Sequence, residues 1–171
     1  VLLLANGAAN CPEIKPGTSE AILFQNALNQ VCVYLAKEIA RDGEGASRLF
    51  EVTIEGAKSL AGARMAARSV TSSNLVKTAV HGNDPNWGRI MMAIGKSGAE
   101  IEESKIALYI NDVCIMENGL PIPFFKDAIV ANMKGPNVRF LINLNSGSYT
   151  ATAWGCDMSE AYVVINSAYS T

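Results

Sequence analysis

The spacing of apolar residues along the chain changes near residue 45. Before that point, an apolar run at 1–5 is followed by five apolar residues at helical spacing: Phe24, Leu28, Val31, Leu35 and Ile39. The run is typical of a strand buried on both faces, and the spaced residues predict an amphipathic helix from about Thr18 to Arg41. One strand and one helix leave apolar faces in water, so we expect residues 1–45 to be the tail of a larger α/β domain.

From residue 46 onward, shorter segments alternate between strand and helix patterns. A strand is expected over 49–54, where apolar residues alternate. The expected helices lie at 60–70, 85–94 and 124–133. The second of these should be capped by Asp84, with Pro85 in its first turn.

The last third of the chain has a strand-rich pattern. A strand pair is expected from 106–115 and a partner after Gly119. Alternating residues on both sides of Ser146-Gly147 predict a hairpin, and a last apolar run lies at 162–165. Strand–helix units with a late hairpin indicate a second, α+β domain over 46–171, so the expected class of the chain is α/β (α+β).

Composition narrows the classes of partner. The 171 residues are 49% hydrophobic and 18% charged with a net charge of −2, and no block of Lys or Arg favours nucleic acid or an anionic membrane. No apolar run approaches the length of a membrane span. Four cysteines stand far apart and His81 has no Cys or His near it in sequence, which argues against a metal site such as zinc. We expect all four cysteines to be reduced, as in the cytoplasm.

The most informative local feature is the carboxylate of Glu44 between Gly43 and Gly45. The two glycines allow a positive φ or a close backbone approach, and a cleft at the junction of two domains would place Glu44 beside a ligand. The alternative is that Gly43 ends the helix and Glu44 is a solvated loop residue. Local chemistry alone favours this second interpretation.

Other motifs have simpler structural explanations. Gly95-Lys96-Ser97 lacks the earlier glycine of a P-loop, since Ile90 stands at that position, and it suits a helix end. The turn-rich segment 81–89 could hold a ligand at a helix N-terminus, but a turn that buries Trp87 explains it as well. No residue pattern indicates an activated nucleophile, so no catalytic residue is predicted in this chain.

Six segments taken together resemble one family. They are Leu-Leu-Leu-Ala-Asn-Gly at 2–7, Arg-Asp-Gly-Glu-Gly-Ala at 41–46, Leu-Val-Lys-Thr-Ala at 75–79, Asp-Pro-Asn-Trp-Gly-Arg-Ile at 84–90, Ala-Thr-Ala-Trp-Gly-Cys-Asp at 151–157 and Ile-Asn-Ser-Ala-Tyr-Ser-Thr at 165–171. In this order they resemble the β chain of the ArgJ family, the glutamate N-acetyltransferase / ornithine acetyltransferase of arginine biosynthesis. The resemblance covers essentially the whole chain and implies the C-terminal part of a DmpA/ArgJ-like fold.

The resemblance also implies a reaction. Members cut themselves before a threonine, which then takes the acetyl group of N2-acetylornithine and passes it to glutamate by a ping-pong mechanism. The family's threonine, oxyanion-hole residues and a substrate lysine have no counterpart here, so this chain alone is expected to be inactive. The implied partners are the α chain and the remaining part of the β chain, in a cytoplasmic α/β heterotetramer. No resident cofactor is implied, although acetyl-CoA serves some members as a co-substrate.

Three substrate-binding positions carry over from the resemblance: Glu44, Asn166 and Thr171. The polar tail, which looks like a frayed terminus by itself, is thereby expected to line the site. Two alternatives remain open at this stage. One is a non-catalytic amino-acid-binding or interaction module of the same fold, and the other is an N-terminal-nucleophile aminopeptidase.

Overall fold

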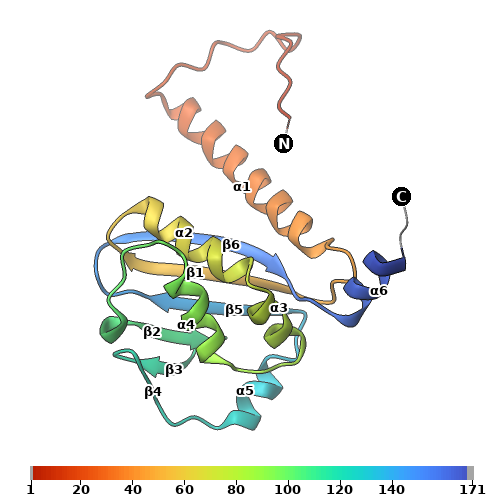
Figure 1. Cartoon of the computed structure of the whole chain (residues 1–171). Coiled ribbons are helices and arrows are strands. Elements are labelled where there is room, and N and C mark those ends of the chain that lie inside the picture. The colour runs from red at the N-terminus through yellow and green to blue at the C-terminus, as the bar shows by residue number, and fades with distance from the viewer. Residues whose placement is uncertain (1, 169–171) are drawn as a thin grey trace. The chain divides into compact units, whose positions relative to one another are not determined.

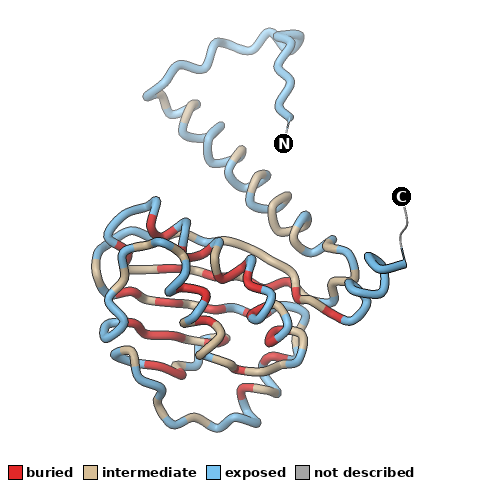
Figure 2. Tube along the Cα trace, in the orientation of Figure 1, coloured by how far each residue is buried: buried red, intermediate tan, exposed pale blue. Residues whose placement is uncertain are grey.

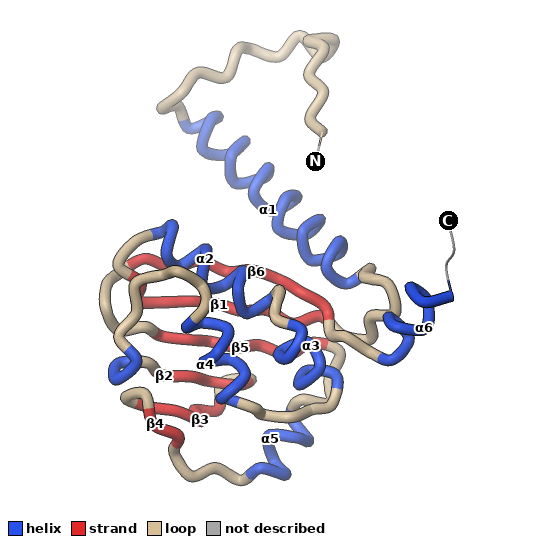
Figure 3. The backbone as a smooth tube through the Cα atoms, in the orientation of Figure 1, coloured by secondary structure: helices blue, strands red, loops and turns tan. Residues whose placement is uncertain are grey.

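The structure is a computed structural model that describes residues 2–168 (Figures 1 and 3). The chain divides into two compact units, and the division falls between Ile39 and Ala40. The domain boundary expected after residue 45 stays a prediction.

The first unit holds most of one long helix. Helix α1 spans Ser19–Arg41, and Thr18 caps it, since its Oγ1 accepts a hydrogen bond from the Ala21 N–H at 3.3 Å. The predicted helix is therefore confirmed. None of its residues is buried, and Phe24, Val31 and Ile39 of the apolar stripe are 45%, 52% and 74% exposed.

The strand expected at 1–5 is not formed by its described residues. Residues 2–5 belong to no strand, and the side chains of Leu2 and Leu4 are more than four-fifths exposed. An apolar run forms a strand only when a neighbour satisfies its backbone groups, and the described residues of the first unit contain no strand that could pair with it. Val1 lies outside the described residues.

The second unit is built on a six-stranded mixed sheet. Its strands are β1 (Leu49–Ala57), β2 (Ala107–Ile110), β3 (Val113–Glu117), β4 (Leu120–Pro121), β5 (Asn137–Asn143) and β6 (Tyr149–Cys156). Their order across the sheet is β4-β3-β2-β5-β1-β6. Strand β1 pairs parallel to β5 and antiparallel to β6, so it lies between the two strands that follow last in sequence.

This order shows that the predicted hairpin is wrong. Strands β5 and β6 exist as expected, but β1 separates them. Their connection passes over the end of β1, where Leu144 and Ser146 donate backbone hydrogen bonds to Glu55 and Gly56 at 2.9 and 2.8 Å. Alternating residues predict a strand and its faces but do not identify its partner.

The expected strand over 106–115 is two strands with a tight turn between them. Asn111 and Asp112 take φ of 44° and 70°, a conformation that these two residue types tolerate better than most. The chain therefore reverses within the apolar run, and β2, β3 and β4 form an antiparallel edge of the sheet (Figure 1).

Helices α2 (Leu60–Thr71), α3 (Asn74–His81) and α4 (Trp87–Gly95) lie on one face of the sheet, as Figure 1 shows. Small residues let α2 approach closely, because Ala63, Ala66 and Ala67 are at most 1% exposed. They belong to the same buried cluster as the fully buried Phe50, Val52 and Ile54 of β1. Figure 2 shows buried backbone along the strands in the middle of the sheet and along the helices that cover them. Burying a side chain of that size contributes roughly 1.5–3 kcal/mol, so β1 lies at the centre of the core.

The start of α4 differs from the prediction in two ways. Asn86, not Asp84, is its N-cap, and the Asn86 Oδ1 accepts from the Arg89 N–H at 3.2 Å. Asp84 instead accepts a hydrogen bond from the Asn86 side chain at 3.0 Å, which leaves Pro85 before the helix. Trp87 is 37% exposed, so the expected burial of its ring is wrong. Its position at the first helical residue puts it beside solvent rather than on the core face.

Three short elements complete the unit: the 3-10 helix η1 (Glu103–Lys105), α5 (Lys126–Asn132) and α6 (Glu160–Ala168). Helix α6 directly follows the end of β6 and contains the last apolar run. Its side chains from Tyr162 to Ile165 are between 41% and 62% exposed.

Candidate functional site

The loop that follows α1 is shaped by two glycines that admit close neighbours. Gly45 has a φ of +67°, and a Cβ there would lie 2.6 Å from the Tyr162 nitrogen. A Cβ on Gly43 would lie 2.6 Å from the Cys156 sulfur. A larger residue at position 45 would push this loop away from the start of α6, and one at position 43 would require the Cys156 side chain to move. The loop thus lies directly against α6.

Glu44, on this loop, meets Asn166 of α6. The Asn166 Nδ2 donates to the Glu44 Oε2 at 2.9 Å and also to the Tyr162 carbonyl at 2.9 Å. The expectation that Asn166 lies beside Glu44 is therefore confirmed, although the two are 122 positions apart in sequence. Both side chains are exposed, so a ligand can reach them. Thr171, the third predicted residue, lies outside the described residues.

A buried carboxylate beneath the loop was missed from the sequence. Asp157 is 3% exposed and follows β6. Its Oδ1 accepts from the backbone N–H groups of Ser47 and Arg48 at 2.8 and 2.9 Å, and its Oδ2 accepts from the Ser47 hydroxyl at 2.6 Å. Burial by itself would raise the pKa of Asp157, but the hydrogen bonds from Ser47, His81 and Arg48 together lower it. Asp157 is thus held as a carboxylate that orders residues 47–48.

His81, at the end of α3, connects this carboxylate to α6. Its Nδ1 lies 2.8 Å from the Asp157 Oδ2, and its Nε2 lies 3.2 Å from the Glu160 Oε2. The pKa of Glu160 is lowered, first by a hydrogen bond from its own backbone N–H and then by the charge of His81. The signal in the sequence was the single histidine of the chain together with an acidic residue directly after a small-residue strand.

Arg48 fixes the same loop from its other side. Its Nη1 donates to the carbonyls of Val80 and Met133 at 3.1 Å each, and to the Asn83 side chain. Because these acceptors end α3 and α5, the loop is tied to both helices.

Comparison with known proteins supplies the family. The model of the ArgJ family matches residues 1–171, which is the whole chain. The chain belongs to the ArgJ family. The arginine biosynthesis bifunctional proteins ArgJ of Symbiobacterium thermophilum and Oceanobacillus iheyensis are each 47% identical to it over 171 residues. The chain is covered completely in both, but it spans only 42% of the length of each relative.

A solved ArgJ structure shows that the fold is shared. The crystal structure of the bifunctional protein from Bacillus halodurans is 40% identical to this chain, with a TM-score of 0.93. The match covers 96% of this chain and 78% of the solved one. The mixed α/β class and the ArgJ-like fold predicted from the motifs are therefore confirmed.

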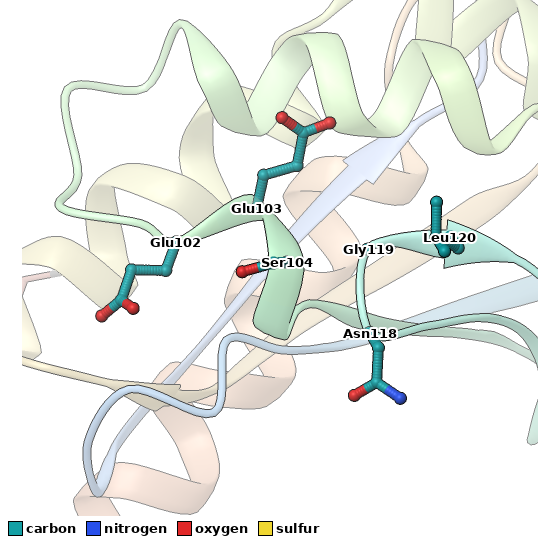
Figure 4. A pocket seen from close by; sticks show the side chains of 6 residues that line it. All are labelled: Glu102, Glu103, Ser104, Asn118, Gly119 and Leu120. Carbon is teal, nitrogen blue, oxygen red and sulfur yellow. The ribbon is translucent and has the colours of Figure 1, made fainter.

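Within this ArgJ-family chain, a separate surface hollow of about 600 Å³ lies between η1 and the turn before β4 (Figure 4). Figure 4 shows Glu102, Glu103 and Asn118 directed away from one another rather than toward one point. Glu102 is already paired with Lys105 at 2.8 Å. The hollow belongs to the far edge of the sheet and adds nothing to the Glu44 site.

Other classes of site find no support in the described part of the chain. Residues 2–168 hold no group of three His, Cys, Asp or Glu side chains arranged for a metal ion. They also contain no helix long and apolar enough to cross a membrane. All four cysteines are free, and Gly95-Lys96 forms the end of α4, as expected for a helix end rather than a phosphate loop.

Proposed function

We propose that the chain is part of an ArgJ-type acetyltransferase that moves the acetyl group of N2-acetylornithine to glutamate in arginine biosynthesis. The observation that carries the proposal is the 2.9 Å hydrogen bond between Glu44 and Asn166. It joins two of the segments that resemble the family, and it puts a carboxylate and an amide on an accessible surface. The printed names of the relatives, bifunctional proteins of arginine biosynthesis, agree with this.

Glu44 and Asn166 supply the chemistry that an amino-acid substrate needs. The Glu44 carboxylate is an acceptor for a substrate ammonium group, in a charge-assisted hydrogen bond. The Asn166 NH₂ group donates to Glu44 and to the Tyr162 carbonyl, so its own carbonyl oxygen is the group that accepts a hydrogen bond from a substrate ammonium. In the proposed enzyme these two residues and Thr171 hold N-acetylornithine and then glutamate.

The acyl transfer itself is proposed to use a threonine outside these 171 residues. Its hydroxyl oxygen attacks the acetyl carbonyl, the bond from that carbon to the ornithine nitrogen breaks, and the hydroxyl proton passes to the departing amine. The amine of glutamate then attacks the acetyl-threonine ester and regenerates the hydroxyl. An oxyanion hole, also supplied from elsewhere, stabilises both tetrahedral intermediates.

The proposed assembly combines this chain with an α chain and the remaining part of the β chain in a cytoplasmic α/β heterotetramer. No resident cofactor is required by the proposed chemistry. Acetyl-CoA as a second acetyl donor fits the word bifunctional in the relatives' names, and an assay with and without N-acetylornithine separates the two donors.

The test is acetyl transfer from labelled N-acetylornithine to glutamate by the full-length protein. We expect activity in the intact enzyme and none in the 171-residue chain alone. Glu44→Gln should raise KM for N-acetylornithine about ten-fold or more, since a charge-assisted contact is lost. Glu117→Gln, an exposed carboxylate on β3, is the matched control and should leave KM unchanged.

Two outcomes would contradict the proposal. An intact enzyme that binds N-acetylornithine but never transfers its acetyl group would favour the non-catalytic binding module. An unchanged KM in Glu44→Gln would remove Glu44 from the substrate site.

A further inference from the structure

Helix α6 carries Asn166, yet its own side chains do little to hold it. None of the residues from Glu160 to Ala168 is buried. A short helix without a buried face is only marginally stable by itself, so other contacts must hold it in position. The described contacts near its first turn are polar, and they converge on the segment 157–160.

Two backbone hydrogen bonds and three side chains anchor that segment. The Asp157 N–H donates to the Arg48 carbonyl at 3.1 Å, and the Met158 N–H donates to the Lys77 carbonyl at 3.3 Å. The Asp157 carboxylate accepts three hydrogen bonds from residues 47–48, as described above, and the Ser159 hydroxyl donates to the Gly45 carbonyl at 2.5 Å. The third side chain is His81, whose two ring nitrogens face Asp157 and Glu160. Since both partners are carboxylates and only accept, both contacts are hydrogen bonds only when both ring nitrogens carry a proton.

We propose that His81 is a positioning residue of the substrate site, which acts by fixing the first turn of α6 so that Asn166 reaches Glu44. The proposal rests on the proposed function for its kinetic consequence, but not for its structural one. Asn166 lies six residues after Glu160, about 9 Å along a helix, so a tilt at the first turn is carried directly to Asn166. His81 is placed for this because it joins α3, which packs on α4, to the start of α6.

Two carboxylates face His81, and they have different roles. One is Asp157, just after β6, and the other is Glu160 on α6. Asp157 is buried and is already satisfied by Ser47 and Arg48, so it holds the ring in place. Glu160 is exposed and belongs to α6 itself, so its contact with the Nε2 transmits the position of the ring to the helix. Glutamine at position 81 carries both of its donor hydrogens on one nitrogen, so it cannot reproduce two donors that leave the ring from separate nitrogens toward Asp157 and Glu160.

The structural arm of the test is hydrogen exchange of the α6 amides in the full-length protein. His81→Gln should speed exchange at residues 163–166 by about five-fold or more, while Ser167→Ala, on the same helix, should not. Unchanged exchange in His81→Gln would overturn the proposal whether or not the protein transfers acetyl groups. A wild-type protein without acetyl transfer would refute the proposed function but leave this arm able to decide.

The kinetic arm is a double-mutant cycle with N-acetylornithine as the varied substrate. If His81 acts through Asn166, His81→Gln should raise KM more than it lowers kcat, and the double variant His81→Gln/Asn166→Ala should be no worse than Asn166→Ala alone. Multiplicative losses in the double variant would show that His81 acts independently of Asn166 and would overturn the proposal. Ser167→Ala serves again as the control with wild-type KM.

Discussion

Strand β1 and helix α1 have similarly regular apolar patterns and opposite environments. In β1, Phe50, Val52 and Ile54 are fully buried, whereas Phe24, Val31 and Ile39 of α1 are about half exposed or more. The difference comes from their partners, because β1 has a strand on each side and α2 across its face, and the α1 stripe has no buried residue. Periodicity therefore predicts which side of an element is apolar, but only a partner buries it.

Truncation of a large side chain in each element should show the greatest contrast. Phe50→Ala should cost about 3–5 kcal/mol of unfolding free energy, because it removes a fully buried ring. In the 171-residue chain, Ile39→Ala should change it by less than about 0.5 kcal/mol, as is usual for exposed positions. Urea denaturation measures both.

The full-length protein tests whether the α1 stripe stays exposed when the rest of the protein is present. If the α1 stripe packs against strands from the rest of the protein, as the sequence predicts, Phe24→Ala should cost roughly 2–4 kcal/mol there. A negligible cost in the full-length protein would mean that the stripe faces water and that the domain assignment for 1–45 is wrong.

The second prediction concerns the buried carboxylate of Asp157. Asp157→Asn should cost about 1.5–3 kcal/mol, because hydrogen bonds to a charged acceptor become weaker and one donor is left facing another. The folded-state pKa of Asp157 is lowered, so its contribution is complete above the ordinary pKa of an aspartate. It is lost as the pH falls through the lower folded value.

Denaturation midpoints between pH 7 and pH 2 check this second prediction. The wild-type protein should lose stability in the acid range more steeply than Asp157→Asn. Equal pH dependence of the two proteins would mean that Asp157 contributes no net charge stabilisation.

The smallest expected effect compares two glycines with a positive φ. Gly45→Ala meets both an unfavourable φ and the Tyr162 backbone, whereas a Cβ at Gly98, with a φ of +77°, meets nothing within 4 Å. Gly98→Ala should cost only the conformational term, about 1–2 kcal/mol. Gly45→Ala should cost about 1 kcal/mol more and should speed hydrogen exchange in α6. Equal losses of stability in the two variants, measured by thermal unfolding, would show that the loop moves to accommodate the added Cβ without an energetic penalty.

Sequence patterns predicted elements well and neighbours poorly, for physical reasons. The period of α1 and the alternation in β1, β5 and β6 are properties of each segment, and those elements formed. The place of β1 between β5 and β6 depends on long-range pairing, which no local spacing contains. The caps of α4 and the turn at Asn111-Asp112 depend on side-chain choices among several polar residues that are equally suited.

Some residues of the candidate site could be predicted from the sequence, and others could not. Glu44 and Asn166 came from the family resemblance, and the structure brings them together. The contact between Asp157 and His81 could not be predicted, because a hydrogen bond between side chains 76 positions apart leaves no periodic trace in the sequence. Whether Glu44, Asn166 and Thr171 bind substrate stays a prediction for the kinetic tests above.

The position of β1 also sets the order of events during synthesis. The strand emerges before its partners, which are residues 137–143 on one edge and 149–156 on the other. Until those residues leave the ribosome, β1, whose Phe50, Val52 and Ile54 are fully buried in the folded protein, has no ladder to join and must be shielded from aggregation. We therefore expect released chains that end near residue 135 to be degraded by a protease and those extended beyond residue 160 to resist it. Resistance in the shorter chains would mean that β1 finds a temporary partner.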